Sequence, residues 1–349
     1  MEQNNNLLFL KSFNKSIDNV SEEIKKDKYM KNPHFYSFIK SSMYMICRRM
    51  SYQDETSNKQ IAVIQEDKMF EAILDFFKSI DIEFYNKALE ILKNKYPNTK
   101  TYIYDFHKED PNHLTYYSIQ YEKGMVRIFL PLRHKLSEDE AKEIDLKFGE
   151  DFYTIDDLYS ITHEISHLFD ITPESYTNYP SQTRDVLTEV TPGIFELLLS
   201  EYLLKKGLFD ENIIKWKKSS INNRLLSHAN LCRIKLEFLE LKRKKGEITQ
   251  EDIELMMEND LLTNDEFVNI LNLIVCSEVK VFENKRYAFC CMCAPIIFQK
   301  CKKDKDQNSL KKYLHECSQN IPFTDVLNGF GIDLKREIDK YKDKDIIER

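Results

Sequence analysis

Two histidines lie four residues apart in the sequence His163-Glu164-Ile165-Ser166-His167. The apolar residues around them recur at helical spacing, and residues i and i+4 lie on the same face of a helix. Both imidazoles can therefore reach a single ion. A catalytic zinc binds histidine nitrogens, uses three protein ligands and keeps its fourth position for water. We predict one zinc ion per chain, with His163 and His167 as two of its ligands.

Glu164 directly follows the first histidine. In a helix that reads H-E-x-x-H, this carboxylate stands beside the metal-activated water instead of binding the metal. It can then take the proton of that water. We therefore predict Glu164 as the general base of a hydrolytic reaction.

A second segment with helical spacing, Val186 to Lys205, carries Glu189 and Glu196 seven residues apart. Seven residues are about two helical turns, so both carboxylates should face the same side. We predict Glu189 as the third metal ligand and Glu196 as the group that holds the other ring nitrogen of a ligand histidine. Exposure on the surface of an amphipathic helix is the alternative for each. Pro192 should kink this helix because it lacks an N–H.

Asp170 lies three residues after His167 and shares its helix face. Two interpretations are open: it orients an imidazole of the metal site, or it is a surface charge at the helix end. The other histidines have no ligand spacing, and we interpret them as loop or core residues: His34, His107, His113, His134, His228 and His315.

The rest of the sequence predicts a mainly α protein. Only seven glycines and nine prolines interrupt 349 residues, and apolar residues recur every three or four positions. One region, Lys100 to Leu132, alternates in polarity and predicts a small antiparallel sheet of about three strands beside the metal-binding helix. We expect a helical N-terminal segment at 1–64 and a catalytic domain at 65–349, packed as one compact unit. The clearest helical stretches are Met69 to Lys78, Glu83 to Lys95, Ile155 to Phe169, Val186 to Lys205 and Asp265 to Val275.

Composition excludes several classes of protein. The net charge is -7, and no face rich in Lys and Arg stands out, so we expect no nucleic-acid partner. No apolar run is long enough to span a membrane, and the run Leu7 to Leu10 is too short for a signal peptide, so we expect a cytoplasmic protein. The eight cysteines lack a disulfide framework and are interpreted as reduced thiols. For Cys290, Cys291 and Cys293, burial in a helix is favoured over a second metal site.

These residues resemble the active site of the oligoendopeptidase F and thimet oligopeptidase family of gluzincins. The family pattern is a helix with H-E-x-G-H, followed by a helix that reads roughly R-D-F-V-E-x-P-S-Q-x-x-E. Here Arg184, Asp185, Glu189 and Glu196 match that pattern, with one residue inserted before Glu189. Pro192 is displaced by one position.

The similarity continues on both sides of the site. Glu71 to Leu89 resembles the helical segment before the family's small sheet, and Phe323 to Leu334 is similar to its C-terminal signature, which ends in G-x-D-L. We take the resemblance to cover residues 65 to 335.

The resemblance implies a helical zincin-type metallopeptidase fold and a peptide substrate. It implies that His163, His167 and Glu189 bind zinc and that Glu164 acts as general base and then as general acid. It also implies that the small sheet lends an edge strand to the substrate backbone, a known mode of peptide recognition. Met125 to Leu132 is the strand that we select for this role.

The chain departs from the family in the segment that should stabilise the oxyanion. Family members supply a histidine and tyrosines from a glycine-rich loop before a late helix, but residues 276–293 contain no histidine and no glycine. Tyr287 is the candidate donor there, with Tyr176 and Tyr179 as substitutes, and a tyrosine in the protein core is the alternative for Tyr287. Full members of the family are also much longer.

Three functions remain open at this point. The first is a zinc metallopeptidase that hydrolyses oligopeptides. The second is a weakly active or inactive relative that binds peptides or a partner protein, and the third is an endopeptidase effector dedicated to one protein target. The sequence also leaves homo-oligomerisation open.

Overall fold

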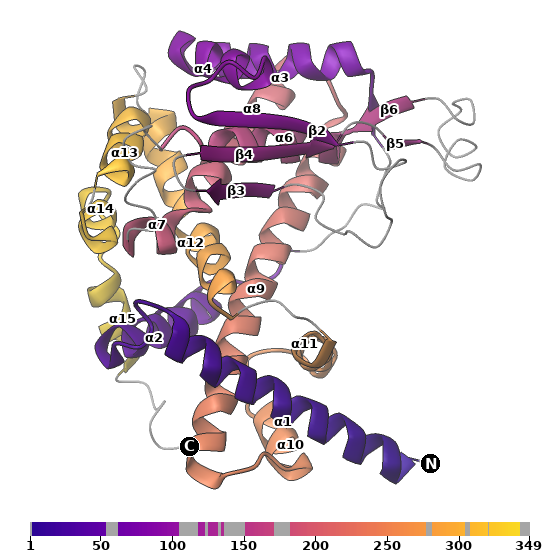
Figure 1. The fold of residues 1–349 in the computed structure, drawn as a ribbon, viewed down its shortest axis with the longest axis vertical. Coiled ribbons are helices and arrows are strands. Elements are labelled where there is room, and N and C mark those ends of the chain that lie inside the picture. Colours follow the sequence, from indigo (N-terminus) through magenta and orange to yellow (C-terminus); the bar gives the residue numbers. More distant parts are fainter. Residues whose placement is uncertain are drawn as a thin grey trace. The chain divides into compact units, whose positions relative to one another are not determined.

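The computed structural model describes residues 2–53, 62–104, 118–122, 125–131, 134–135, 151–170, 182–276, 281–303, 308–319 and 321–342. Helices dominate these residues, which confirms the predicted mainly α class (Figure 1). The chain groups into two compact units. Unit 1 contains Met1–Gln53, Ile221–Met292 and Gly331–Arg349, and unit 2 contains Asp54–Ser220 and Cys293–Phe330. The predicted domain boundary at residue 64, and the packing of both parts as one unit, stay proposals.

The regular secondary structure in the described part of unit 1 is helical. Arg233 is buried and forms a two-pronged ion pair with Asp260, whose oxygens lie 2.7 and 2.8 Å from the two guanidinium nitrogens. Helix α15 packs on α2, and α11 packs on both α1 and α10. The helices of this unit are α1 (Glu2–Lys26), α2 (Pro33–Arg49), α10 (Gln250–Glu258), α11 (Asn264–Cys276) and α15 (Leu334–Lys342), together with most of α9 (Glu211–Lys245) and the first half of α12 (Val281–Lys303).

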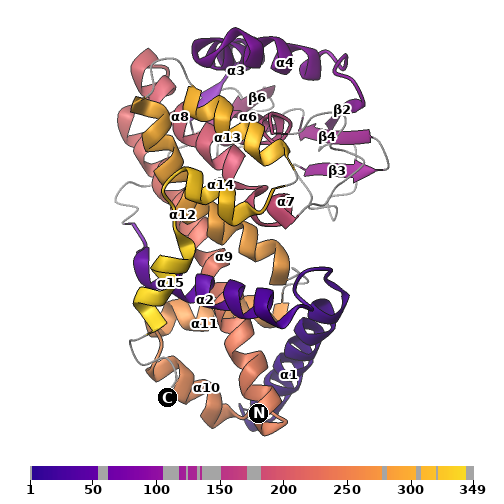
Figure 2. The same cartoon turned by 90° about the vertical axis from the view of Figure 1, so that its left-hand side faces the viewer.

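Unit 2 holds the two predicted ligand segments. Its principal helix pair is α6 (Ile155–Ser166) and α8 (Val190–Lys206), which pack on each other, and α7 contacts both α13 and α14 (Figure 2). The other helices are α3 (Glu66–Ile80), α4 (Ile82–Leu92), α7 (Gln182–Leu187), α13 (Asn308–Ser318) and α14 (Phe323–Gly329). The strands are β1 (Val63–Ile64), β2 (Thr99–Tyr104), β3 (Ser118–Glu122), β4 (Met125–Pro131), β5 (His134–Lys135) and β6 (Asp151–Thr154).

The predicted three-stranded sheet is present, but two features of it differ from expectation. Its order is β2-β4-β3, and β4 is antiparallel to β3 but parallel to β2, so the sheet is mixed. The central strand β4 packs on α6, as a sheet beside the metal-binding helix requires. Because β4 is paired on both sides, our selection of Met125 to Leu132 as the edge strand for a peptide was wrong. Leu132 itself lies outside the described residues.

A second small sheet lies at the N-terminal end of α6. Its order is β1-β6-β5, and both pairings are antiparallel. Strand β6 ends at Thr154, and α6 begins at the next residue. The H-E-x-x-H helix is therefore held by a strand at its N-terminal end and by the β4 sheet along its side.

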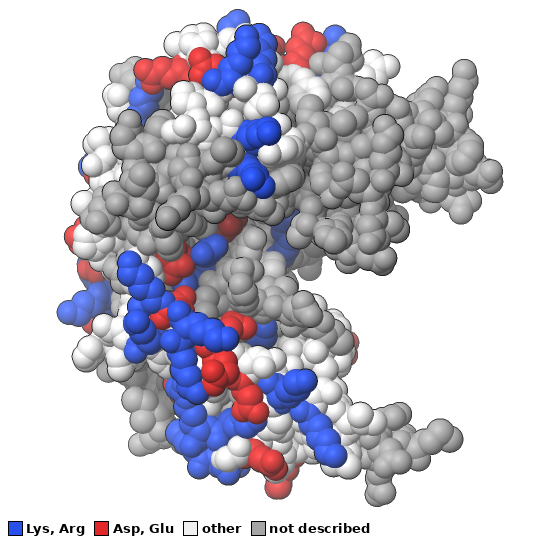
Figure 3. Space-filling view, viewed as in Figure 1, with Lys and Arg blue, Asp and Glu red and all other residues white. Residues whose placement is uncertain are grey.

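Three features of the described residues bear on the predictions from composition: the surface charges, the apolar character of the helices and the cysteines. Lys and Arg are mixed with Asp and Glu over the described part of the face in Figure 3, and ion pairs such as Lys242 with Asp18 join them within unit 1. Among the described residues, no helix has both the length and the apolar character that crossing a bilayer requires. Seven cysteines are free and buried, as expected of reduced thiols: Cys47, Cys232, Cys290, Cys291, Cys293, Cys301 and Cys317.

Candidate metal centre

Helix α6 begins at a capping box that fixes its first turn. The Thr154 hydroxyl accepts from the Asp157 N–H at 3.3 Å, and the Asp157 carboxylate accepts from the Thr154 N–H at 2.6 Å. The helix ends at Ser166, and His167 is its C-cap with φ -56° and ψ -22°. Because His167 keeps helical dihedrals, and its N–H donates to the His163 carbonyl at 3.3 Å, the two imidazoles still share one face.

The predicted helix Val186 to Lys205 is broken in two, which corrects our expectation of a kink. Helix α7 ends at Leu187 and α8 begins at Val190, so that Glu189 is the N-cap of α8. Pro192 is the third residue of α8, in the first turn, where the N–H that it lacks has no partner within the helix. The Glu189 side chain makes no capping hydrogen bond to α8 and is directed at the histidines.

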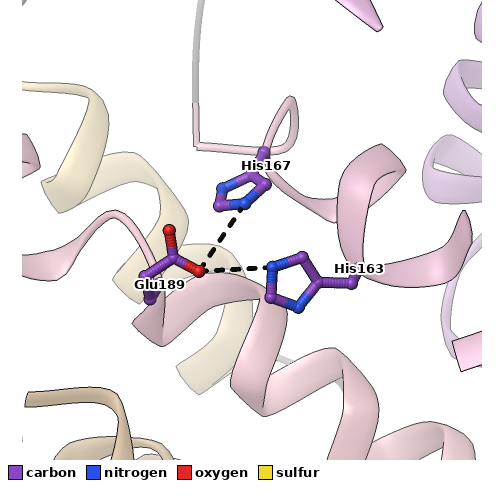
Figure 4. A group of neighbouring side chains, drawn as sticks. All are labelled: His163, His167 and Glu189. Carbon is purple, nitrogen blue, oxygen red and sulfur yellow. Dashed lines mark ion pairs between the residues drawn. The ribbon is translucent and has the colours of Figure 1, made fainter. Parts of the chain in front are cut away.

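The three predicted ligands come together at one point (Figure 4). The Glu189 Oε2 atom lies 3.2 Å from His163 Nε2 and 3.9 Å from His167 Nε2, and one donor atom from each residue lies within 4.8 Å of the others. Two donors bound to a tetrahedral zinc at about 2.05 Å would be roughly 3.4 Å apart. The donor set and its spacing therefore fit a metal ion.

Glu196 lies on the opposite side of the first imidazole. Its Oε1 atom is 3.1 Å from His163 Nδ1, the position that the sequence predicted for it. A proton on Nδ1 satisfies this hydrogen bond and leaves the Nε2 lone pair directed toward Glu189 and His167. Glu196 is buried, so surface exposure, the alternative interpretation, does not apply to it or to Glu189.

Charge and burial act on this histidine in opposite directions. Burial lowers the pKa of the His163 imidazole, but the nearby carboxylates, led by Glu196, outweigh burial and raise the pKa well above its ordinary value. Glu189 and Glu164 act in the same direction. Glu164 is itself buried. This collection of carboxylates also favours the binding of a cation.

Asp170 is buried, which rules out the surface charge that we had kept as one interpretation. One oxygen of its carboxylate accepts a hydrogen bond from the Thr191 hydroxyl at 2.6 Å. Thr191 belongs to the first turn of α8, two residues after Glu189. We did not single out Thr191 from the sequence, although a polar residue within the apolar segment that carries a ligand was a usable signal.

A cluster of phenylalanines supports both ligand segments from behind. Phe169 follows His167 by two residues, and its ring centroid is 5.0 Å from that of Phe195, which precedes Glu196. The Phe169 ring also lies 5.1 Å from the ring of Phe77 on α3 and 5.0 Å from that of Phe84 on α4. Edge-to-face and tilted packing of this kind restricts ring motion. It therefore holds the segments that carry His167 and Glu196 in fixed positions.

Of the three candidate oxyanion donors, Tyr287 lies within the described residues. Tyr287 belongs to unit 1, where its ring stacks on His228 with centroids 4.5 Å apart, and His228 Nδ1 is 2.8 Å from the Asn284 amide oxygen. Tyr176 and Tyr179 lie outside the described residues.

Comparison with known proteins gives one fold relationship. No family model matches the sequence, and neither does any curated protein. The chain is similar to the crystal structure of a "putative peptidase" from Chlamydophila abortus, with a TM-score of 0.52 and 16% sequence identity. The match covers 95% of this chain and 55% of the other, so this chain spans about half the length of that protein. At this identity the likeness shows a shared fold.

Proposed function

We propose that this chain is a zinc-dependent metallopeptidase that hydrolyses peptide bonds in oligopeptides, related to the oligoendopeptidase F and thimet oligopeptidase family. The observation that carries the proposal is the convergence of His163, His167 and Glu189 on one point. Two histidines and a glutamate are the ligands of several zinc peptidases. The Chlamydophila protein of similar fold is described as a "putative peptidase", which supports the same class of reaction.

Each residue of the site has a separate role in this proposal. Zinc held by the three ligands would polarise the substrate carbonyl and lower the pKa of a bound water. Glu164 takes the proton of the attacking water and passes it to the leaving amine. Glu196 holds His163 in the tautomer whose Nε2 can donate its lone pair to a metal, because it occupies Nδ1 at 3.1 Å.

Two further parts of the proposal concern the substrate. Tyr287 is our candidate for the hydrogen bond to the oxyanion, with Tyr176 and Tyr179 as substitutes. If the substrate backbone adds to the β4 sheet, it must pair with β2 or β3, the outer strands of that sheet in the described residues.

The test combines metal content with peptide hydrolysis. We expect one zinc per chain in the wild type and Glu164→Gln, a loss of zinc in His167→Ala, and cleavage of a quenched peptide library by the wild type but by neither of these variants. The Glu164→Gln variant should lose at least about a hundredfold in kcat because only the base is missing. Glu201→Gln is a matched control, since Glu201 pairs with Lys302 on the surface of α8. A wild-type chain that takes up no metal would overturn the proposal.

A second function, a peptide-binding or protein-binding module, is favoured by one observation. The segment 276–293 contains neither a histidine nor a glycine for an oxyanion loop. For this function, the wild type and Glu164→Gln would bind zinc and peptides equally and show the same negligible turnover. An endopeptidase dedicated to one target would instead cleave a single protein in a cell extract and lose that cleavage in Glu164→Gln.

A further inference from the structure

The two ligand segments meet at a pair of residues that do not bind the metal. His167 is the C-cap of α6 and Glu189 is the N-cap of α8, so both ligands lie at helix ends. Neither helix by itself determines the distance between them. Asp170 follows His167 by three residues and Thr191 follows Glu189 by two, and their hydrogen bond of 2.6 Å joins the two ends.

The surroundings make this hydrogen bond a strong one. Thr191 is fully buried, and the exposed fraction of Asp170 is only 3%. A hydroxyl that donates to a carboxylate forms a charge-assisted bond, and a low local dielectric strengthens it. Tyr313 of α13 is also fully buried, and it lies close enough to the pair for the Asp170 charge to contribute to raising the pKa of its phenol, after burial and Cys317.

We propose that Asp170 and Thr191 position His167 against Glu189 and so set the geometry of the metal site. This inference rests on the proposed metal-binding function. Asp170 acts through Thr191 on the position of Glu189, a different role from orienting an imidazole. Outer contacts of this kind typically change metal affinity by roughly 10- to 100-fold when they are removed.

The decisive variant is Thr191→Val, which keeps the volume of the side chain but removes the hydroxyl. We expect zinc affinity, measured by competition with a chromophoric chelator, to fall at least about tenfold. Thr191→Ser retains the hydroxyl and should restore wild-type affinity. The absorption spectrum of the cobalt-substituted protein should change in Thr191→Val and return in Thr191→Ser, because it reports coordination geometry.

Ser200→Ala is the matched control for a general loss of stability. Ser200 is buried and its hydroxyl lies 2.7 Å from that of Tyr159, so it also joins α6 and α8, but away from the ligand-bearing ends. We expect Ser200→Ala to lower the unfolding temperature and leave zinc affinity unchanged. If Thr191→Val does not fold, Asp170→Asn takes its place, because it keeps the side-chain volume and removes the charge of the acceptor.

Three outcomes would count against the inference. Wild-type zinc affinity in Thr191→Val, or in Asp170→Asn if that variant replaces it, would overturn it while leaving the proposed function intact. An equal loss of affinity in Ser200→Ala would overturn it too, because the effect would then be one of stability. A wild-type chain that binds no zinc would overturn both this inference and the proposed function.

Discussion

Glu196 holds the Nδ1 atom of His163 at 3.1 Å, while the Nε2 atom of the same ring faces Glu189 at 3.2 Å. One imidazole therefore lies between two carboxylates that are seven residues apart. The carboxylate on Nδ1 fixes which nitrogen carries the proton, and so which nitrogen is available to a metal. In the proposed metal site, Glu196 would therefore orient a ligand without being one.

We predict that Glu196→Gln weakens zinc binding by roughly 10- to 100-fold. The neutral amide is a poorer acceptor than a carboxylate, so it holds the tautomer and ring orientation less firmly. Competition with a chromophoric chelator would measure the change. Glu201→Gln, five residues further along α8, should bind zinc as the wild type does because Glu201 pairs with Lys302 at the surface. Equal affinities in the wild type and Glu196→Gln would contradict the role that we assign.

The clustering of His163, His167 and Glu189 could be predicted in part from local spacing, although the approach of the two segments depends on packing. His163 and His167 share a face in any helix, and Glu189 and Glu196 lie a whole number of turns apart. The break between α7 and α8 was not predicted, since Pro192 was placed in the interior of a helix when it lies in a first turn. The hydrogen bond between Asp170 and Thr191 was also missed, because it joins two helix ends that are separate in the sequence and meet only in the folded chain.

The fold shows the same division between local and long-range information. Alternating polarity gave the three strands around Lys100 to Leu132, and helical periodicity gave α3, α4, α6 and α11. Alternating polarity does not reveal strand direction. Strands β2 and β4 pair in parallel, although β3 lies between them in the sequence. The grouping of Met1–Gln53 with Ile221–Met292 also depends on contacts between distant segments, which periodicity does not report.

Tyr287→Phe separates a role in catalysis from a role in packing. Phenylalanine preserves the stack on His228 but removes the hydroxyl that would bond the oxyanion. We predict a fall in kcat of about a hundredfold with zinc affinity unchanged. Initial rates on a quenched peptide, with metal content measured in parallel, would test this. Unchanged turnover would make Tyr287 a packing residue and shift the search for the donor to Tyr176 and Tyr179.

Asp252 provides a prediction for pH dependence. Its hydrogen bond from Lys245, with help from Thr249 in a capping box, holds the pKa of the Asp252 carboxyl below its ordinary value. A lowered pKa stabilises the folded state above the unfolded pKa of about 3.9, and this contribution is lost as pH falls through the folded pKa. Asp252→Asn should therefore lower the free energy of unfolding at pH 7, and lower it by less near pH 3.

Urea unfolding at a series of pH values would measure that difference. Glu251→Gln is the control, since Glu251 is an exposed acid in the same helical turn. Its stability curve should run parallel to that of the wild type. A destabilisation by Asp252→Asn that stays constant from pH 7 to pH 3 would show that the Asp252 charge does not contribute.

Zinc should stabilise the folded chain in proportion to its binding, independently of any peptide hydrolysis. A ligand present at 100 times its Kd adds about 2.7 kcal/mol to the free energy of unfolding when only the folded state binds it. We predict that zinc raises the unfolding temperature of the wild type and of Glu164→Gln by the same amount, because in our proposal Glu164 acts as a base and not as a ligand. Glu189→Gln and His167→Ala should lose most of the increase. A smaller zinc-dependent increase in Glu164→Gln than in the wild type would place Glu164 on the metal and remove it as the general base.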